Sequence, residues 1–354
     1  MISRLSKSSI VNKFAKSRSM LAGLGQYSLN FIAVAHDITP FISVYPWSAG
    51  FGTKYTNPAT LPTGAGRGLS FNPGATVIAV AHEITPFISV YPWNPGFGTK
   101  YTNPATLPTD DARGVVFNPA GTAIALTHNS SPYISVYPWS YLTGFGTKYA
   151  NPATLPTGFR PYVRFNPTGT AIAVSHSTTP FISAYPWSDA TGFGTKYSNP
   201  VTLPVGDGNG LAFNSAGTVI ALGHNSSPYI SVYPWSDATG FGTKYANPAT
   251  LPTGLVNDVA FNPAGTAIAV AHNTSPRISV YPWNAGFGTK YANPATLPTG
   301  NGYGVTFNPA GDTIAVAHST TPFISVYPWS AGFGTKYANP ATLPTGLGYA
   351  VSFI

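Results

Sequence analysis

Residues 261–300, FNPAGTAIAVAHNTSPRISVYPWNAGFGTKYANPATLPTG, are one copy of a unit that recurs along the chain in nearly identical form. The tryptophan of this unit occurs seven times, at steps of 46, 46, 48, 48, 48 and 46 residues, and a histidine stands 11 residues before each tryptophan. A repeat of roughly 20–50 residues is typical of solenoids and propellers, in which each copy buries its apolar faces against its neighbours. The repeat therefore decides the fold class.

The pattern within one copy predicts β-strands. Ile268 and Val270 fall on one face of an alternating stretch and alanines fall on the other, so that a neighbouring sheet could approach the alanine face closely. Proline and glycine end each stretch, and Pro294 ends the last one. The predicted strands of this copy span residues 258–261, 266–272, 277–283 and 289–293. Four short antiparallel strands per copy indicate a propeller blade.

The two ends of the chain carry complementary parts of the unit. The first copy begins at about Leu29 with a second strand, whereas residues 348–354 read as a first strand with nothing after it. Together they would complete one blade, and neither end has the polar cap of an open solenoid. We therefore expect an all-β chain with a short N-terminal arm at residues 1–28 and a closed seven-bladed β-propeller of four-stranded blades at residues 29–354.

Two resemblances follow from these motifs. The stretches VAFNPAGTAIAVAH (259–272) and ISVYPWNAG (278–286) resemble the tryptophan–aspartate (WD) repeat, which implies a propeller over residues 29–354. The chain departs from that family where Pro282 replaces the aspartate of its dipeptide, and the family's His–Asp network is not evident. The sequence pattern ISVYPW…GFGTKYANPATLP also resembles repeats of bacteriophage virion and tail-associated proteins, and this resemblance implies a virion component.

Composition narrows the class of protein. Charged residues make up 7% of the chain, but 43% is hydrophobic and 14% aromatic, which excludes a disordered polyampholyte. The sequence contains no run of 18 apolar residues, so we predict no membrane-spanning helix. It contains no cysteine, which excludes disulfides. The net charge is +8, of which residues 1–28 carry +5. We therefore expect no nucleic-acid partner and no membrane insertion.

Three side chains recur in every copy, and each admits two interpretations. The tryptophans either pack between blades or form exposed stacking platforms for sugars. The histidines either bond a neighbouring loop or respond to pH. One histidine per blade cannot converge on one ion, so we expect no metal and no cofactor. The lysines either discourage aggregation at an exposed edge or form a ring of weak anion contacts.

The residues that differ between copies gather in the connection from the fourth strand to the next first strand. In a propeller these connections meet on one face around the central channel, so they predict a single partner-binding mouth. Drift at exposed loop tips is the alternative. Four arginines from consecutive connections should form one basic sector of this mouth. The predicted mouth residues are Arg67, Asp110, Asp111, Arg113, Arg160, Arg164, Asp207, Asn209, Asn257, Asp258, Asn301 and Tyr303.

The N-terminal arm does not fit the repeat. Its apolar residues could form one face of a short helix, which would be unstable alone and would order on an acidic partner. A disordered leader is the alternative. The predicted docking residues are Ile10, Val11, Lys13, Phe14, Lys16 and Arg18.

Catalysis is not expected from these patterns. Glu83 is the one glutamate among nine acidic residues, no acid–base pair recurs, and neither a Gly-x-Ser-x-Gly elbow nor a P-loop occurs. We expect a non-enzymatic structural and adhesive protein of the bacteriophage tail or virion surface. Its partner would be a virion protein or a host-surface glycan, and its location the virion. A multivalent carbohydrate-binding propeller lectin and an intracellular, cytoplasmic scaffold of the WD type are the alternatives.

Overall fold

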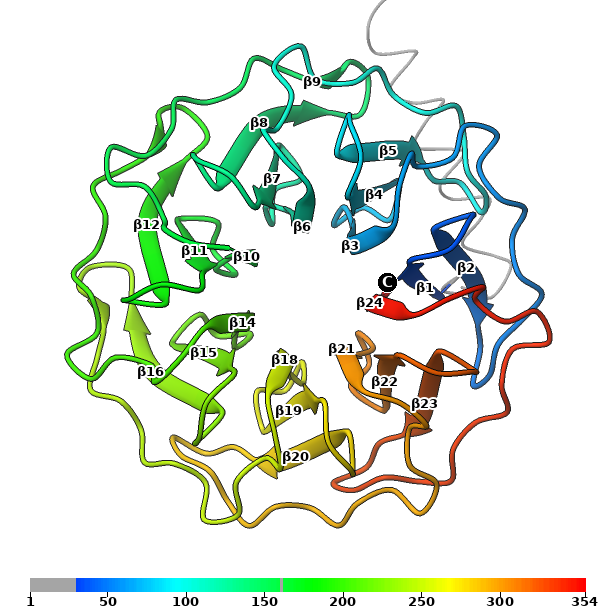
Figure 1. The fold of residues 1–354 in the computed structure, drawn as a ribbon, viewed down its shortest axis with the longest axis vertical. Coiled ribbons are helices and arrows are strands. Elements are labelled where there is room, and N and C mark those ends of the chain that lie inside the picture. Colours follow the sequence, from blue (N-terminus) through cyan, green and yellow to red (C-terminus); the bar gives the residue numbers. More distant parts are fainter. Residues whose placement is uncertain (1–29, 160–161) are drawn as a thin grey trace, which may run out of the picture. The chain divides into compact units, whose positions relative to one another are not determined.

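The computed structural model describes residues 30–159 and 162–354, which form seven antiparallel sheets set around a central opening (Figure 1). Three sheets have four strands and four sheets have three, and no helix occurs among the described residues. This all-β arrangement is consistent with the predicted propeller. The predicted N-terminal arm, with the predicted docking residues Ile10, Val11, Lys13, Phe14, Lys16 and Arg18, lies outside the described residues.

Six of the seven sheets are built from strands that follow one another in the chain, and the innermost strand comes first in each. The seventh sheet joins the first strands of the described chain to its last. The sheets comprise β3 (Gly66–Phe71), β4 (Val77–His82) and β5 (Ile88–Pro92); β6 (Ala112–Phe117), β7 (Ala123–His128), β8 (Ile134–Ser140) and β9 (Gly144–Phe145); β10 (Val163–Phe165), β11 (Ala171–Ser175), β12 (Ile182–Ser188) and β13 (Gly192–Phe193); β14 (Gly208–Phe213), β15 (Val219–His224), β16 (Ile230–Ser236) and β17 (Gly240–Phe241); β18 (Val256–Phe261), β19 (Ala267–His272) and β20 (Ile278–Pro282); β21 (Gly302–Phe307), β22 (Thr313–His318) and β23 (Ile324–Pro328); and β1 (Asn30–His36), β2 (Ile42–Trp47) and β24 (Gly348–Phe353).

The last strand pairs with the first. Strand β24 runs antiparallel to β1, with Phe353 opposite Ile32 and Val351 opposite Val34. The amide of Phe31 donates to the carbonyl of Ile354 at 3.1 Å, and the amide of Ile354 donates back to Phe31 at 3.1 Å. Figure 1 shows the red β24 beside the blue β1. The first and last strands of the described residues therefore belong to one sheet.

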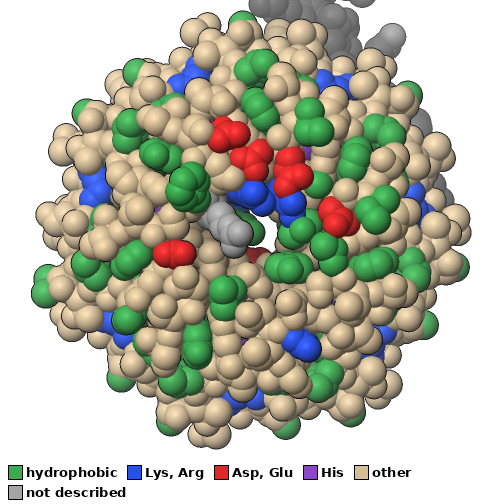
Figure 2. Space-filling model, in the orientation of Figure 1, with side chains coloured by type: hydrophobic (Ala, Val, Ile, Leu, Met, Phe, Trp, Pro, Cys, Tyr) green, Lys and Arg blue, Asp and Glu red, His purple; other side chains and the backbone are tan. Residues whose placement is uncertain are grey.

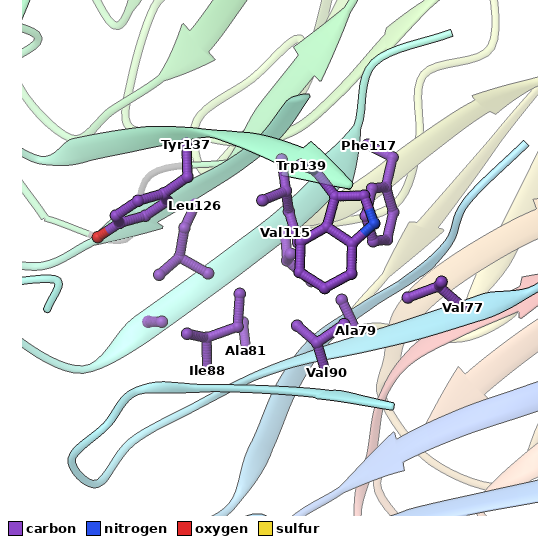
Figure 3. Packing of buried hydrophobic residues seen from close by; sticks show 12 residues of the cluster. Val77, Ala79, Ala81, Ile88, Val90, Val115, Phe117, Leu126, Tyr137 and Trp139 are labelled. Carbon is purple, nitrogen blue, oxygen red and sulfur yellow. The ribbon is translucent and has the colours of Figure 1, made fainter. Parts of the chain in front are cut away.

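The interfaces between sheets follow from the alternation in the sequence. Val77, Ala79 and Ala81 of β4 face the larger Leu126 and Trp139 of the next sheet, and all five side chains are buried in one cluster (Figure 3). Small residues on one face and large residues on the other let neighbouring sheets approach without a void. Seven such clusters occur, each shared by two neighbouring sheets.

Each tryptophan belongs to this packing. Trp139 is 5% exposed, and its indole makes edge-to-face contacts with Phe117, Phe145 and Tyr101 at centroid distances of 5.7, 5.0 and 4.9 Å. Tyr101 comes from the loop of the preceding sheet, so the indole joins two sheets. All seven tryptophans are 2–6% exposed. The packing interpretation is therefore confirmed, and the stacking-platform alternative is wrong.

The repeated histidines are also buried within the sheets. The Nδ1 of His36 lies 2.8 Å from the carbonyl oxygen of Ile38, and its Nε2 lies 3.0 Å from the hydroxyl of Ser43. Burial lowers the pKa of His36 to about 4. Burial likewise lowers the pKa of each of the other six histidines to about 4. Each histidine is therefore a neutral structural residue at pH 7.

The predicted fourth strand at residues 289–293 is wrong. These residues form no strand, and the amide of Tyr291 makes a single hydrogen bond to the carbonyl of Val280, at 2.9 Å. Pro282 has no N–H to donate, so the ladder beside β20 cannot continue. The outer edge instead carries an isolated bridge between Trp283 and Phe287. In three sheets the longer loop after the tryptophan extends this bridge into the two-residue strands β9, β13 and β17.

Candidate functional site

The innermost strands share a bulge at one end of the central opening. In β3, Gly66 pairs with His82 and Gly68 with Ala81, so Arg67 between them has no partner in the ladder. The same irregularity occurs in β6, β14, β18, β21 and β24. A bulge re-aims the side chain of its extra residue. The bulged residues are Arg67, Arg113, Asn209, Asn257, Tyr303 and Tyr349.

These six side chains line one pocket of about 280 Å³, together with Tyr162. In the order of the sheets, two arginines are followed by Tyr162, two asparagines and two tyrosines. The pocket therefore has a cationic sector, an amide sector and an aromatic sector, although the sheets that carry them are nearly identical. Figure 2 shows cationic side chains within the central opening and acidic side chains gathered along one side of it. We call this pocket the mouth pocket.

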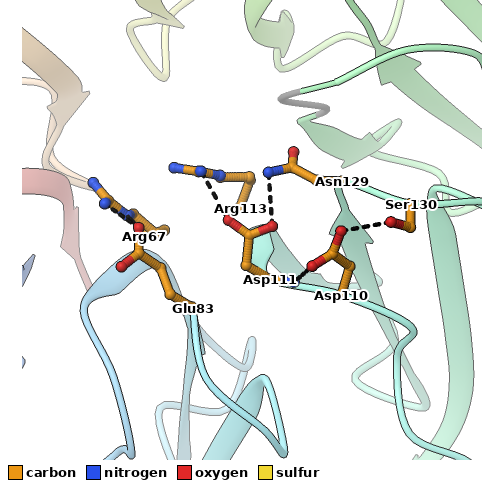
Figure 4. Close-up of polar contacts among 7 residues, drawn as sticks. All are labelled: Arg67, Glu83, Asp110, Asp111, Arg113, Asn129 and Ser130. Carbon is orange, nitrogen blue, oxygen red and sulfur yellow. Dashed lines mark hydrogen bonds and ion pairs between the residues drawn. The ribbon is translucent and has the colours of Figure 1, made fainter.

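Arg67 is held by two neighbours. Its Nε donates to a carboxylate oxygen of Glu83 at 2.7 Å, and its Nη2 donates to the same oxygen (Figure 4). Its guanidinium carbon lies 3.8 Å from the centroid of the Tyr349 ring. Burial would lower the pKa of Arg67, but the bonds to Glu83 and Tyr349 outweigh burial and raise it. Arg67 is thus a fixed cation on the wall of the pocket.

Arg113 is oriented by a second set of carboxylates. Its Nη2 donates to Asp111 at 2.8 Å, and Asp111 also accepts from the amide nitrogen of Asn129 at 2.7 Å (Figure 4). Asp110 accepts from the hydroxyl of Ser130 at 2.5 Å, which lowers the pKa of the Asp110 carboxyl. Asp110 therefore supports the loop rather than lining the pocket.

The asparagines and tyrosines of the pocket are positioned by the adjacent sheets. The side-chain amide of Asn209 donates to the carbonyl of Val256 at 2.9 Å, and that of Asn257 donates to Gly302 at 2.7 Å. Each bond uses one of the two N–H groups of the side-chain amide, so the second N–H and the amide oxygen remain available to a ligand. The rings of Tyr303 and Tyr349 lie 5.1 Å apart with an interplanar angle of 36°.

Below the bulges, three polar side chains fill the channel. Tyr162, Arg164 and Asp258 line a cavity of about 30 Å³. Asp258 accepts from the amides of Val259 at 2.9 Å and Val305 at 3.0 Å. Burial raises the pKa of Asp258, and the nearby Arg164 opposes that shift.

Sequence equivalence explains why Tyr162 reaches the mouth pocket. Tyr162 and Asp258 occupy the position that is glycine in four other sheets, at Gly68, Gly114, Gly210 and Gly304. Where the repeat has glycine, the inner strands of neighbouring sheets approach closely: a Cβ at Gly68 would lie 2.5 Å from the carbonyl oxygen of Arg113. From this repeat position Tyr162 lines the mouth pocket, whereas Asp258 lines only the smaller cavity.

The predicted basic sector of four arginines is partly wrong. Arg67 and Arg113 line the mouth pocket together, but Arg164 lies deeper, within strand β10 opposite Ala173, and lines the smaller cavity. Arg160 lies outside the described residues. Asn301 is also absent from the lining, since its Oδ1 accepts from Arg277 at 2.8 Å.

Sequence reasoning missed Tyr162, Tyr349 and Glu83. Tyr349 occupies the same repeat position as Arg67 and Tyr303, so aligning the copies on that position could have found it. Glu83 directly follows the repeated His82, where the other copies vary as well. Within residues 30–159 and 162–354, no group of three or more histidine, aspartate or glutamate residues is placed to hold a metal ion. That part of the chain also contains no helix suited to crossing a membrane.

The sequence matches no protein-family model and no curated protein. Solved structures share the fold at low identity. A Bacteroides fragilis protein assigned as a 6-phosphogluconolactonase is 13% identical with a TM-score of 0.73, covering 93% of this chain and 99% of that one. The Pseudomonas aeruginosa periplasmic gluconolactonase is 14% identical with a TM-score of 0.70, covering 92% and 99%. Kuenenia stuttgartiensis hydrazine synthase is 13% identical with a TM-score of 0.61, covering 86% and 92%.

These similarities bear on two expectations from the sequence. The expectation of a non-enzymatic bacteriophage component is contradicted, because solved structures that share this fold over nearly the whole chain are named as lactonases. The resemblance to virion repeats has no support among them. No recurring motif marks the mouth pocket in the sequence, because the pocket takes a different residue from each sheet, at repeat positions 46 to 48 residues apart.

Proposed function

We propose that the chain is a lactonase that opens the lactone ring of a sugar acid in the mouth pocket. We further propose that the seven sheets form a closed propeller, sealed by the pairing of β24 with β1, which would hold the six bulged residues at fixed positions. The proposal rests on the named activity of proteins with this fold and on the residues of the pocket.

The three sectors of the pocket suit an anionic, polyhydroxylated ligand. Arg67 and Arg113 offer charged donors to a carboxylate, a phosphate or a carbonyl oxygen. The bonds to the next sheet hold the side-chain amides of Asn209 and Asn257 in place, and their amide oxygens can accept from hydroxyl groups. The Tyr349 and Tyr303 rings offer an apolar wall to the face of a sugar ring.

The same groups can assist ring opening. A water oxygen bonds to the lactone carbonyl carbon, the ring C–O bond breaks, and the ring oxygen leaves as a hydroxyl group. Negative charge develops on the carbonyl oxygen, where fixed guanidinium groups stabilise it. We propose that Glu83 or Asp111, each of which bonds one of these arginines, takes a proton from the attacking water and passes it to the departing ring oxygen.

One observation carries the proposal: two oriented cations from neighbouring sheets face amide acceptors and tyrosine rings across a pocket of about 280 Å³. The test follows acid release from gluconolactone and 6-phosphogluconolactone, corrected for spontaneous hydrolysis. We expect hydrolysis by the purified chain, and we expect Arg113→Ala to lower kcat/KM by about 100-fold or more, as removal of one oxyanion donor does elsewhere.

The matched control is Arg277→Ala, which removes an arginine that bonds Asn301 and does not line the pocket. This variant should retain the activity of the unmodified chain. Hydrolysis no faster than in buffer would refute the lactonase proposal. Equal losses in Arg113→Ala and Arg277→Ala would refute the assignment of the pocket.

A further inference from the structure

A second hollow adjoins the mouth pocket on the same face of the described unit. It has a volume of about 430 Å³, and it shares Arg113 and Asn209 with the mouth pocket. We call it the side cleft. We propose that the side cleft binds an uncharged sugar unit attached to the lactone, so that the substrates are glycosylated aldonolactones. This inference rests on the proposed lactonase function.

The side cleft has its own apolar surface. Phe159 precedes β10 and is 65% exposed, and Leu255 precedes β18. These two residues occupy one repeat position, at which other sheets carry Ala65 and Asp111. An exposed aromatic ring costs solvation unless something covers it, and the apolar face of a sugar ring is a suitable cover. The cleft thus offers a stacking surface that the mouth pocket does not share.

The polar groups of the cleft suit hydroxyls. Asp207 lies between Phe159 and Leu255 in the order of the sheets, and among the described residues its carboxylate accepts no hydrogen bond. Asn225 lines the same cleft, and its Oδ1 accepts from the backbone amide of Asp207 at 3.0 Å. Its side-chain amide and the Asp207 carboxylate together offer donors and acceptors. Ser177 lines the cleft beside Phe159, with its hydroxyl accepting from the Phe159 amide at 2.7 Å.

Charge decides which part of a ligand enters which hollow. Among residues 30–159 and 162–354, the cations that line these hollows are Arg67, which belongs to the mouth pocket alone, and Arg113, which lines both hollows. The Asp207 carboxylate belongs to the side cleft alone and would repel a phosphate or carboxylate there. The anionic or lactone end therefore belongs in the mouth pocket, and a neutral sugar belongs in the side cleft.

The test compares maltobionolactone with gluconolactone as substrates. We expect kcat/KM to be at least tenfold higher for maltobionolactone. Phe159→Ala should remove that preference and leave the hydrolysis of gluconolactone unchanged. The control is Val205→Ala, which removes another exposed apolar side chain that does not line the cleft and should leave both rates unchanged. Equal rates on both lactones, or a preference that survives in Phe159→Ala, would overturn the inference while the lactonase proposal stands.

If the chain hydrolyses neither lactone, the proposed lactonase function is refuted. Binding measurements then test the side cleft separately. Calorimetric titration with maltobionate and gluconate supplies this readout. We expect maltobionate to bind at least tenfold more tightly and Phe159→Ala to abolish the difference. Equal affinities would overturn the inference independently of catalysis.

Discussion

The interfaces between the sheets and the mouth pocket obey opposite rules within one repeat. At the interfaces, equivalent residues are nearly identical in every copy, because each alanine face must accept the same large side chains from the next sheet. At the bulge, the equivalent residues are arginine, asparagine and tyrosine. Packing therefore constrains every copy in the same way, whereas the bulge places one side chain from each of six sheets around a common axis. The difference teaches that an asymmetric pocket can be assembled on a repetitive scaffold.

The largest expected effect is the loss of stability that acid causes through the buried histidines of the sheets. Each buried histidine has a pKa near 4 in the folded chain against 6.5 as its ordinary value, so the unfolded state binds more protons between these limits. Stability is then fully present above pH 6.5 and falls as the pH drops towards 4. Each histidine contributes a loss of about 3 kcal/mol, and seven act together, so acid unfolding should be complete before pH 4.

Urea titrations at steps from pH 7.5 to 4, followed by circular dichroism, measure this effect. Replacement of one histidine, as in His82→Gln, should reduce by about one the number of protons taken up on unfolding. A free energy of unfolding that stays constant across this range would contradict the structural role of the histidines.

The variants Trp139→Ala and Arg113→Ala compare the stability that an interface residue and a pocket residue contribute. Trp139→Ala removes an indole that joins two sheets and should cost about 3–5 kcal/mol of stability. Arg113→Ala removes a partly exposed side chain with one ion pair and should cost less than about 1 kcal/mol. Thermal unfolding of both variants at pH 7.5 provides the measurement. Similar losses would mean that the mouth pocket is a structural element and not a separate functional one.

A pair of glycines tests the narrow channel with a smaller expected effect. A Cβ at Gly210 would lie 2.3 Å from the Cα of Asp258, whereas a Cβ at Gly74 would meet no atom closer than 3.7 Å. Gly210→Ala should therefore destabilise the chain by about 1–3 kcal/mol, as overpacking does. Gly74→Ala should change stability by less than about 0.5 kcal/mol, since it lies in an exposed turn. Equal denaturation midpoints for the two variants would show that the inner strands can move apart at no cost.

The repeat made most of the scaffold predictable. Alternation in stretches such as 266–272 predicted the strands and the alanine faces, since both depend on local spacing. The strand expected at 289–293 was wrong because the edge is set by Pro282 and by a bridge from Phe287, which propensity does not reveal.

The pocket was predictable only in part. Arg67, Arg113 and Tyr303 were selected because they vary between copies. Tyr349 was missed although it occupies the same repeat position as Arg67 and Tyr303, and Tyr162 was missed because it occupies the next position, which is glycine in four other sheets. No local motif marks the pocket either, because the residues that meet in it are far apart along the chain.

The most direct test of the account is a crystal structure of the chain with 6-phosphogluconate, the product of 6-phosphogluconolactone hydrolysis. We predict that the acid lies in the mouth pocket, with one of its anionic groups within hydrogen-bond distance of Arg67 or Arg113 and its hydroxyls against Asn209 and Asn257. A ligand bound elsewhere on the chain, or a mouth pocket that stays empty at saturating concentration, would contradict it.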